Sequence, residues 1–107
     1  MPYYLIQAAY TADAWASQVK RPQDRAEALR PSIEALGGKL QSFYLSFGEY
    51  DVVLIAEMPD NVSAAAVSIA AAAGGGVKGI KTTPLMTTQE GKEAMRKATQ
   101  AGYRAPS

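Results

Sequence analysis

Two runs of alternating apolar and polar or small side chains, residues 40–47 and 50–57, meet at Gly48-Glu49. Such alternation is typical of β-strands, and a two-residue loop that begins with glycine is typical of a type II′ hairpin. With Gly48 and Glu49 as the loop, one face of the hairpin is almost wholly apolar, so we expect helices to cover it. That face carries the pairs Phe47–Tyr50, Leu45–Val52, Phe43–Leu54 and Gln41–Ala56.

The opposite face of this hairpin mixes polar and apolar side chains. Such a mixture is too apolar for a freely solvated surface and too polar for a dry core, so it indicates a subunit interface or a ligand cleft. A shift of the loop by one residue would exchange the faces of one strand, so this interpretation depends on the turn. The face carries the pairs Ser46–Asp51, Tyr44–Val53, Ser42–Ile55 and Leu40–Glu57.

The N-terminal segment predicts a strand over Tyr3–Tyr10, because apolar and other side chains alternate along it. Thr11 or Asp13 can then cap a short helical turn that carries Trp15 and Val19. We expect one set of strand side chains to face the helices, namely Tyr4, Ile6, Ala8 and Tyr10.

A longer helix is predicted next, with Pro22 in its first turn and Gly37-Gly38 at its end. Pro31 lies inside this helix, where it removes a hydrogen bond, so we expect a kink or a restart near Arg30. The expected buried stripe is Ala26, Leu29, Ile33 and Leu36.

After the hairpin, Asp60 can cap a second long helix that ends at the glycines of residues 74–76. Its expected buried stripe is Val62, Ala66, Ile69 and Ala73.

Val77–Met86 is predicted as the last strand, with Pro84 tolerable at an edge. Thr87 and Glu90 have the spacing of a capping box for a final helix that reaches about Gln100. Residues 102–107 are expected to form a flexible tail.

The predicted order is strand, helix, strand, strand, helix, strand and a C-terminal helix. This is the α+β, ferredoxin-like βαββαβ arrangement, a four-stranded antiparallel sheet with helices on one face. Residues 1–101 then form a single domain. Because two copies packed face to face would cover the remaining face, we expect a homo-oligomer, either a dimer or a multiple of dimers.

Composition excludes several function classes. The chain has 107 residues, a net charge of +1, and neither cysteine nor histidine. The near-zero charge gives no long-range attraction to nucleic acid or an anionic membrane. The absence of these two residue types excludes disulfides, metal sites built from cysteine or histidine, and catalytic triads that use histidine. No secretory signal or membrane-spanning run is evident, so we expect a cytoplasmic protein with no cofactor and no metal.

The run of residues 47–53, Phe-Gly-Glu-Tyr-Asp-Val-Val, resembles the Gly-Tyr-Asp signature of the GYD-domain family. The corresponding residues in this chain are Gly48, Tyr50 and Asp51. Residues 36–40 before it and Met58-Pro59-Asp60 after it extend the resemblance to roughly residues 3 to 90. The resemblance implies the dimeric α/β-barrel version of the ferredoxin-like fold. It implies no particular activity.

Asp51 is the first candidate for chemistry. A partly shielded carboxylate beside the phenol of Tyr44 could serve as a general base or a ligand anchor. The alternative is that Asp51 binds backbone groups of the hairpin or of a partner chain. Tyr50 is interpreted as core packing against Phe47, and Gly48 as the residue that permits a positive φ.

The predicted ligand or interface surface is the mixed face as a whole. Its members are Tyr3, Gln7, Ser42, Tyr44, Ser46, Asp51 and Glu57. The favoured function is that of a small non-enzymatic oligomer that binds a small molecule or scaffolds an assembly through this face. The alternative is a cofactor-independent enzyme, similar to an isomerase or a monooxygenase, that uses Asp51 and Tyr44.

Overall fold

The computed structural model describes residues 1–107. It contains four strands and four helices in the order βααββαβα. The elements are β1 (Tyr3–Tyr10), α1 (Ala12–Lys20), α2 (Arg25–Ala35), β2 (Lys39–Leu45), β3 (Val52–Glu57), α3 (Asn61–Ala73), β4 (Val77–Leu85) and α4 (Thr88–Ala98).

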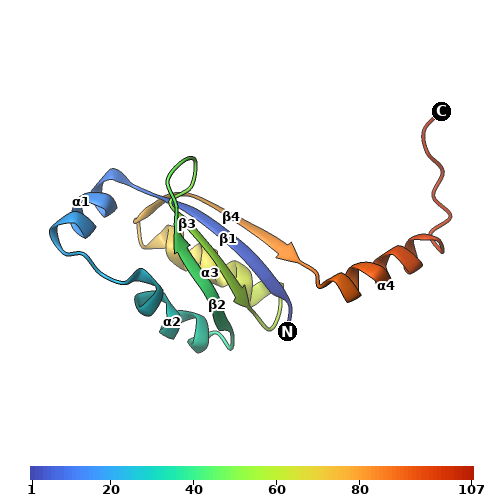
Figure 1. The fold of residues 1–107 in the computed structure, drawn as a ribbon, viewed down its shortest axis with the longest axis horizontal. Coiled ribbons are helices and arrows are strands. Elements are labelled where there is room, and N and C mark those ends of the chain that lie inside the picture. The colour runs from blue at the N-terminus through green and yellow to red at the C-terminus, as the bar shows by residue number, and fades with distance from the viewer.

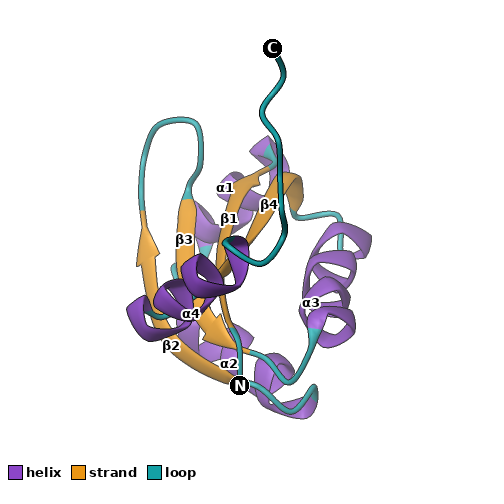
Figure 2. Ribbon diagram, turned by 90° about the vertical axis from the view of Figure 1, so that its right-hand side faces the viewer, coloured by secondary structure: helices purple, strands orange, loops and turns teal.

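The strands form one antiparallel sheet in the order β2-β3-β1-β4, so the ferredoxin-like α+β fold is confirmed. Helices α2 and α3 lie on one side of the sheet, and no helix covers the other side (Figures 1 and 2). We call these the covered face and the open face. The core lies on the covered face, where Tyr4 and Ile6 of β1 are each only 2% exposed. This agrees with the predicted orientation of β1.

Local side-chain chemistry sets the helix starts. The side chains of Thr11, Asp24, Asp60 and Thr87 accept hydrogen bonds from backbone N–H groups in the first turns of α1, α2, α3 and α4. At α4 the predicted capping box is complete, because Glu90 also accepts from the N–H of Thr87.

Helix α2 differs from its prediction at both prolines. It begins at Arg25 rather than at Pro22, because Asp24 provides the cap. It also runs through Pro31 without a restart near Arg30. The predicted stripe is confirmed: Ile33 is fully buried, and Ala26, Leu29 and Leu36 pack against the core.

The predicted buried stripe of α3 is wrong. Val62 and Ile69 are 79% and 68% exposed, whereas Ala64 and Val67 face the core. An alanine-rich helix is apolar on every side, so its periodicity does not fix its rotation. The observed rotation also lets the Ser68 hydroxyl lie 2.8 Å from the Thr82 hydroxyl on β4.

The predicted two-residue turn is also wrong. Strand β2 ends at Leu45 and β3 begins at Val52, so residues 46–51 form a longer loop. The side chain of Phe47 is fully exposed in this loop and does not pair with Tyr50. Gly48 has a φ of +153°, a conformation that favours glycine.

The predicted register holds only next to this loop. Leu45, Phe43 and their neighbours pair as expected, but the ladder shifts between Leu40 and Ser42. A bulge at this point makes Gln41 the extra residue, and Leu40 pairs with Ala56 instead of Glu57. Leu40 is therefore buried and Gln41 is exposed, the reverse of the prediction. The bulge places the apolar side chain in the core and the amide in solvent.

Helix α4 projects away from the domain (Figure 1). Apart from the half-buried Gly91, all its residues are exposed, and Met95 is 72% exposed. The radius of gyration is 17.0 Å, against about 13 Å for a compact domain of this length. The excess reflects the projecting helix and the chain after it, residues 99–107, which has no regular structure.

Candidate functional site

The open face displays its side chains in three rows, set by the strand pairing. One row contains Lys39, Glu57, Tyr3 and Leu85. The next contains Ser42, Ile55, Leu5 and Thr83, and the third contains Tyr44, Val53, Gln7 and Lys81. The middle of the face is therefore apolar, and polar or aromatic groups surround it. Five of the predicted surface residues come together here, namely Tyr3, Gln7, Ser42, Tyr44 and Glu57.

Tyr3 and Glu57 lie directly opposite each other on β1 and β3. Hydrogen bonding to the Glu57 carboxylate, and then the negative charge of that carboxylate, raise the pKa of Tyr3 above its ordinary value of 10.0. Burial and the charge of Glu90 at the start of α4 act in the same direction. The phenol of Tyr3 is therefore neutral at physiological pH and can donate a hydrogen bond.

The two remaining surface residues, Ser46 and Asp51, lie in the loop. The Asp51 carboxylate accepts a hydrogen bond from the N–H of Tyr10 at 2.9 Å, and the Asp51 N–H donates to the Ala8 carbonyl at 2.8 Å. The Ser46 hydroxyl donates to the Tyr50 carbonyl at 2.8 Å. These bonds attach the loop to the end of β1, and no hydrogen bond joins Asp51 to Tyr44.

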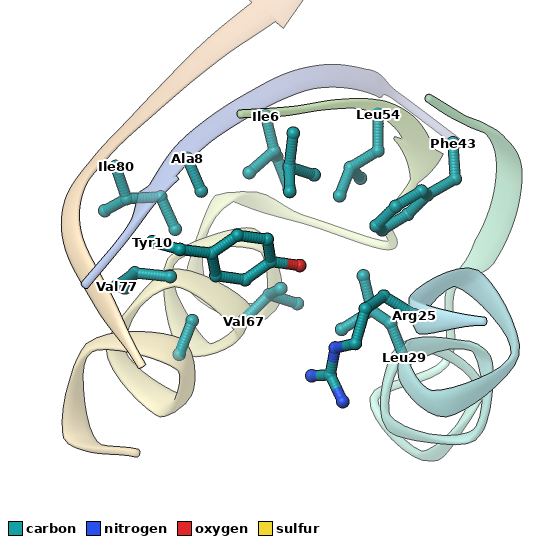
Figure 3. Close-up of a pocket in the computed structure, with 12 residues that line it drawn as sticks. Ile6, Ala8, Tyr10, Arg25, Leu29, Phe43, Leu54, Val67, Val77 and Ile80 are labelled. Carbon is teal, nitrogen blue, oxygen red and sulfur yellow. The ribbon is translucent and has the colours of Figure 1, made fainter. Parts of the chain in front are cut away.

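The covered face contains a cavity that the sequence analysis did not find. It lies between the sheet, α2 and α3, and has a volume of about 80 Å³ (Figure 3). Eleven of its twelve lining residues are hydrophobic, and Arg25 is the charged one. The cavity is only partly enclosed, so it is open to solvent on one side.

A second hollow, of about 190 Å³, adjoins this cavity. Tyr10 and Arg25 line both spaces, which makes them the boundary between an apolar and a polar compartment. The rest of the polar hollow is formed by Ala14, Ser17, Gln18, Gln23 and Gly76.

One signal in the sequence pointed toward the cavity. Arg25 precedes Leu29 by four residues, so both side chains lie on the same side of α2. A cation beside a buried stripe can close the mouth of a cavity, but the same spacing is usual for a solvated arginine. The distance between α2 and α3 decides which applies, and that distance is a tertiary property.

The structure contains no group of three or more acidic residues that could hold a metal ion. None of its helices is both long enough and apolar enough to cross a bilayer.

Comparisons with known proteins bear on both fold and family. The sequence model of the GYD domain matches residues 4–95. No curated protein matches the chain significantly. Among solved structures, the crystal structure of MtbAldR is similar, with a TM-score of 0.57 and 12% sequence identity over 80% of this chain and 53% of that one. The chain thus corresponds to about half the length of that protein, and at this identity the likeness concerns the fold alone.

Proposed function

This chain belongs to the GYD-domain family, and we propose that it is a non-enzymatic homo-oligomer whose subunits pair through the open face of the sheet. The observation that carries the proposal is the uncovered apolar centre of that face, formed by Leu5, Val53 and Ile55. Apolar side chains at the centre of a patch with a polar rim are the usual composition of a protein interface.

The charges around this centre favour a second copy over other partners. Glu57 lies beside Lys39 at one end of the face and Lys81 lies at the other, so the face carries both signs with an excess of only one positive charge. An anionic partner such as nucleic acid requires a clear excess of positive charge. A surface that carries both signs can instead pair with itself.

The size of the surface indicates a role for α4. Four strands about 4.8 Å apart, each about 7 residues long at about 3.3 Å per residue, give a sheet of roughly 450 Å². A standard interface buries about 800 Å² on each partner. We infer that α4 supplies much of the difference, because it extends the molecule beyond the end of β4 with Met95 exposed.

The contacts of Asp51 support a structural role for that residue over catalysis. Its carboxylate accepts the N–H of Tyr10, its own N–H donates to the Ala8 carbonyl, and no hydrogen bond joins it to the Tyr44 phenol that was expected beside it. Asp51 then contributes by holding the loop at the rim of the proposed interface.

The test is Ile55→Glu, which places a carboxylate at the centre of the open face. We expect association to weaken by about 100-fold or more, because the charge would be buried without a partner. Sedimentation velocity and native mass spectrometry report the oligomer, and circular dichroism confirms that the variant folds.

The matched control is Val62→Glu, on the outward side of α3, where the side chain is 79% exposed. It introduces the same charge and should leave the oligomer intact. A wild-type monomer at high protein concentration would contradict the proposal, as would dissociation by Val62→Glu in place of Ile55→Glu.

A further inference from the structure

We propose that the cavity under α2 and α3, together with the polar hollow beside it, binds a short amphipathic monocarboxylate. The apolar tail would occupy the cavity and the carboxylate would lie at its mouth. This site is on the covered face, so the proposal does not depend on how the open face is used.

The shape and polarity of the two spaces indicate an amphipathic ligand. The inner cavity is apolar apart from Arg25 and the Tyr10 hydroxyl, and the outer hollow contributes the amides of Gln18 and Gln23. A ligand that fills both must therefore be apolar at one end and polar at the other. The inner volume of about 80 Å³ limits the tail to a short chain.

The charge at the boundary indicates an anion. Arg25 forms no ion pair, and its guanidinium donates one hydrogen bond, to the Gln23 side-chain oxygen at 2.9 Å. No carboxylate lines either space. Guanidinium groups bind carboxylates through paired, charge-assisted hydrogen bonds, so a monocarboxylate head group suits this position.

Tyr10 supplies a second group at the same boundary. Its ring is buried, and its hydroxyl points into the space between α2 and α3, on the side of Arg25 (Figure 3). This hydroxyl has no hydrogen-bond partner within the protein, whereas Tyr4, the other buried tyrosine of β1 on this face, donates to Asn61. A ligand carboxylate between Arg25 and Tyr10 would accept from both.

The protein has a natural reporter for this site. Trp15 is the only tryptophan, and its ring lies edge-to-face against Tyr10 with the ring centroids 5.1 Å apart. A ligand that contacts Tyr10 should change the emission of Trp15, so binding can be measured on the unmodified chain.

The experiment is a fluorescence titration with hexanoate, compared with hexan-1-ol and hexylammonium, which have the same tail with a neutral or a cationic head group. We expect saturable binding of hexanoate, and binding at least about tenfold weaker for the other two, because they lose the charge-assisted bonds. Equal binding of all three, or no saturable binding of hexanoate, would overturn the proposal.

Two variants and a matched control sharpen the test. Arg25→Gln should weaken hexanoate binding about 10- to 100-fold, because a charged hydrogen-bond pair is lost. Ala71→Leu should abolish it by filling the cavity. Arg30→Gln removes the same charge from the same helix, where it pairs with Glu27 at 3.3 Å, and should leave binding unchanged.

Unchanged affinity in Arg25→Gln, or equal losses in Arg25→Gln and Arg30→Gln, would overturn the assignment of the head-group site. If a variant does not fold, the comparison of the three head groups on the wild-type chain decides the outcome alone.

Discussion

The two faces of β1 carry similar kinds of side chain but have different surroundings. On the covered face Tyr4 and Ile6 are almost completely buried, whereas on the open face Tyr3 and Leu5 remain partly exposed. A tyrosine and an aliphatic residue occur on each side. Their burial is therefore decided by the helices that pack above one side only. One face is a packed core, and the other is an uncovered surface, for which we propose a second copy of the chain as the partner.

The largest effect should come from truncation in the core. Ile6→Ala removes a side chain that is 2% exposed, so we expect a loss of about 2–5 kcal/mol in the free energy of unfolding, measured by urea denaturation. Leu5→Ala, the neighbour on the open face, should cost less than about 1 kcal/mol at protein concentrations low enough to keep the chain monomeric. Equal losses would show that the two faces are equally packed within one subunit.

An intermediate effect is expected at Asp51, which joins the loop to the end of β1. Asp51→Ala removes the acceptor of the Tyr10 N–H, which should cost about 1–3 kcal/mol of stability by urea denaturation. Asp51→Asn retains an acceptor oxygen, so most of the stability should return. Loss of stability in the alanine variant, with no loss in the asparagine variant, would establish the structural role. A fully stable Asp51→Ala variant would contradict it.

The smallest effect is expected at Glu57, on the open face. The neighbouring carboxylate raises the pKa of Tyr3, so the folded state holds the phenolic proton more tightly than the unfolded chain. The resulting stabilisation is present below pH 10.0 and is lost as the pH rises through the raised pKa. Glu57→Gln should lower the pKa of Tyr3, which tyrosinate absorbance measures. It should also remove the loss of stability at alkaline pH, which unfolding measurements in that range detect.

Glu34→Gln, on the helical side, is the control for this titration and should leave the pKa of Tyr3 unchanged. The same downward shift in both variants would indicate a general charge effect and would contradict a specific Tyr3–Glu57 interaction.

Features that depend on neighbouring residues in the chain could be predicted from the sequence. The caps formed by Thr11, Asp60 and Thr87 require only residues within one turn, and the alternation of β1 requires only one strand. The ferredoxin-like order followed from these local patterns. The Gly-Tyr-Asp signature indicated the family for the same reason.

Features that depend on tertiary packing could not be predicted in the same way. The rotation of α3 is fixed by Val67 and by the contact between Ser68 and Thr82, which lie on separate elements. The bulge at Gln41 places Leu40 in the core, and this placement depends on the contacts of Leu40 with other elements.

The candidate site divides along the same line. Strand alternation placed Tyr3, Gln7, Ser42, Tyr44 and Glu57 on one face, because that rule is local. The cavity beside Arg25 and Tyr10 depends on the separation of two helices and left no distinct pattern in the chain. The functional roles proposed for both surfaces remain predictions.

The projecting helix gives the molecule two levels of cooperativity. An 11-residue helix with a glycine at position 91, in which all the other residues are exposed, is only marginally stable in water. In a lone subunit, the backbone amides of α4 should therefore exchange hydrogen with solvent through local unfolding of this helix, while the sheet stays folded. If assembly covers α4, its amides become protected from hydrogen exchange only in the oligomer. The stability of this helix then depends on protein concentration.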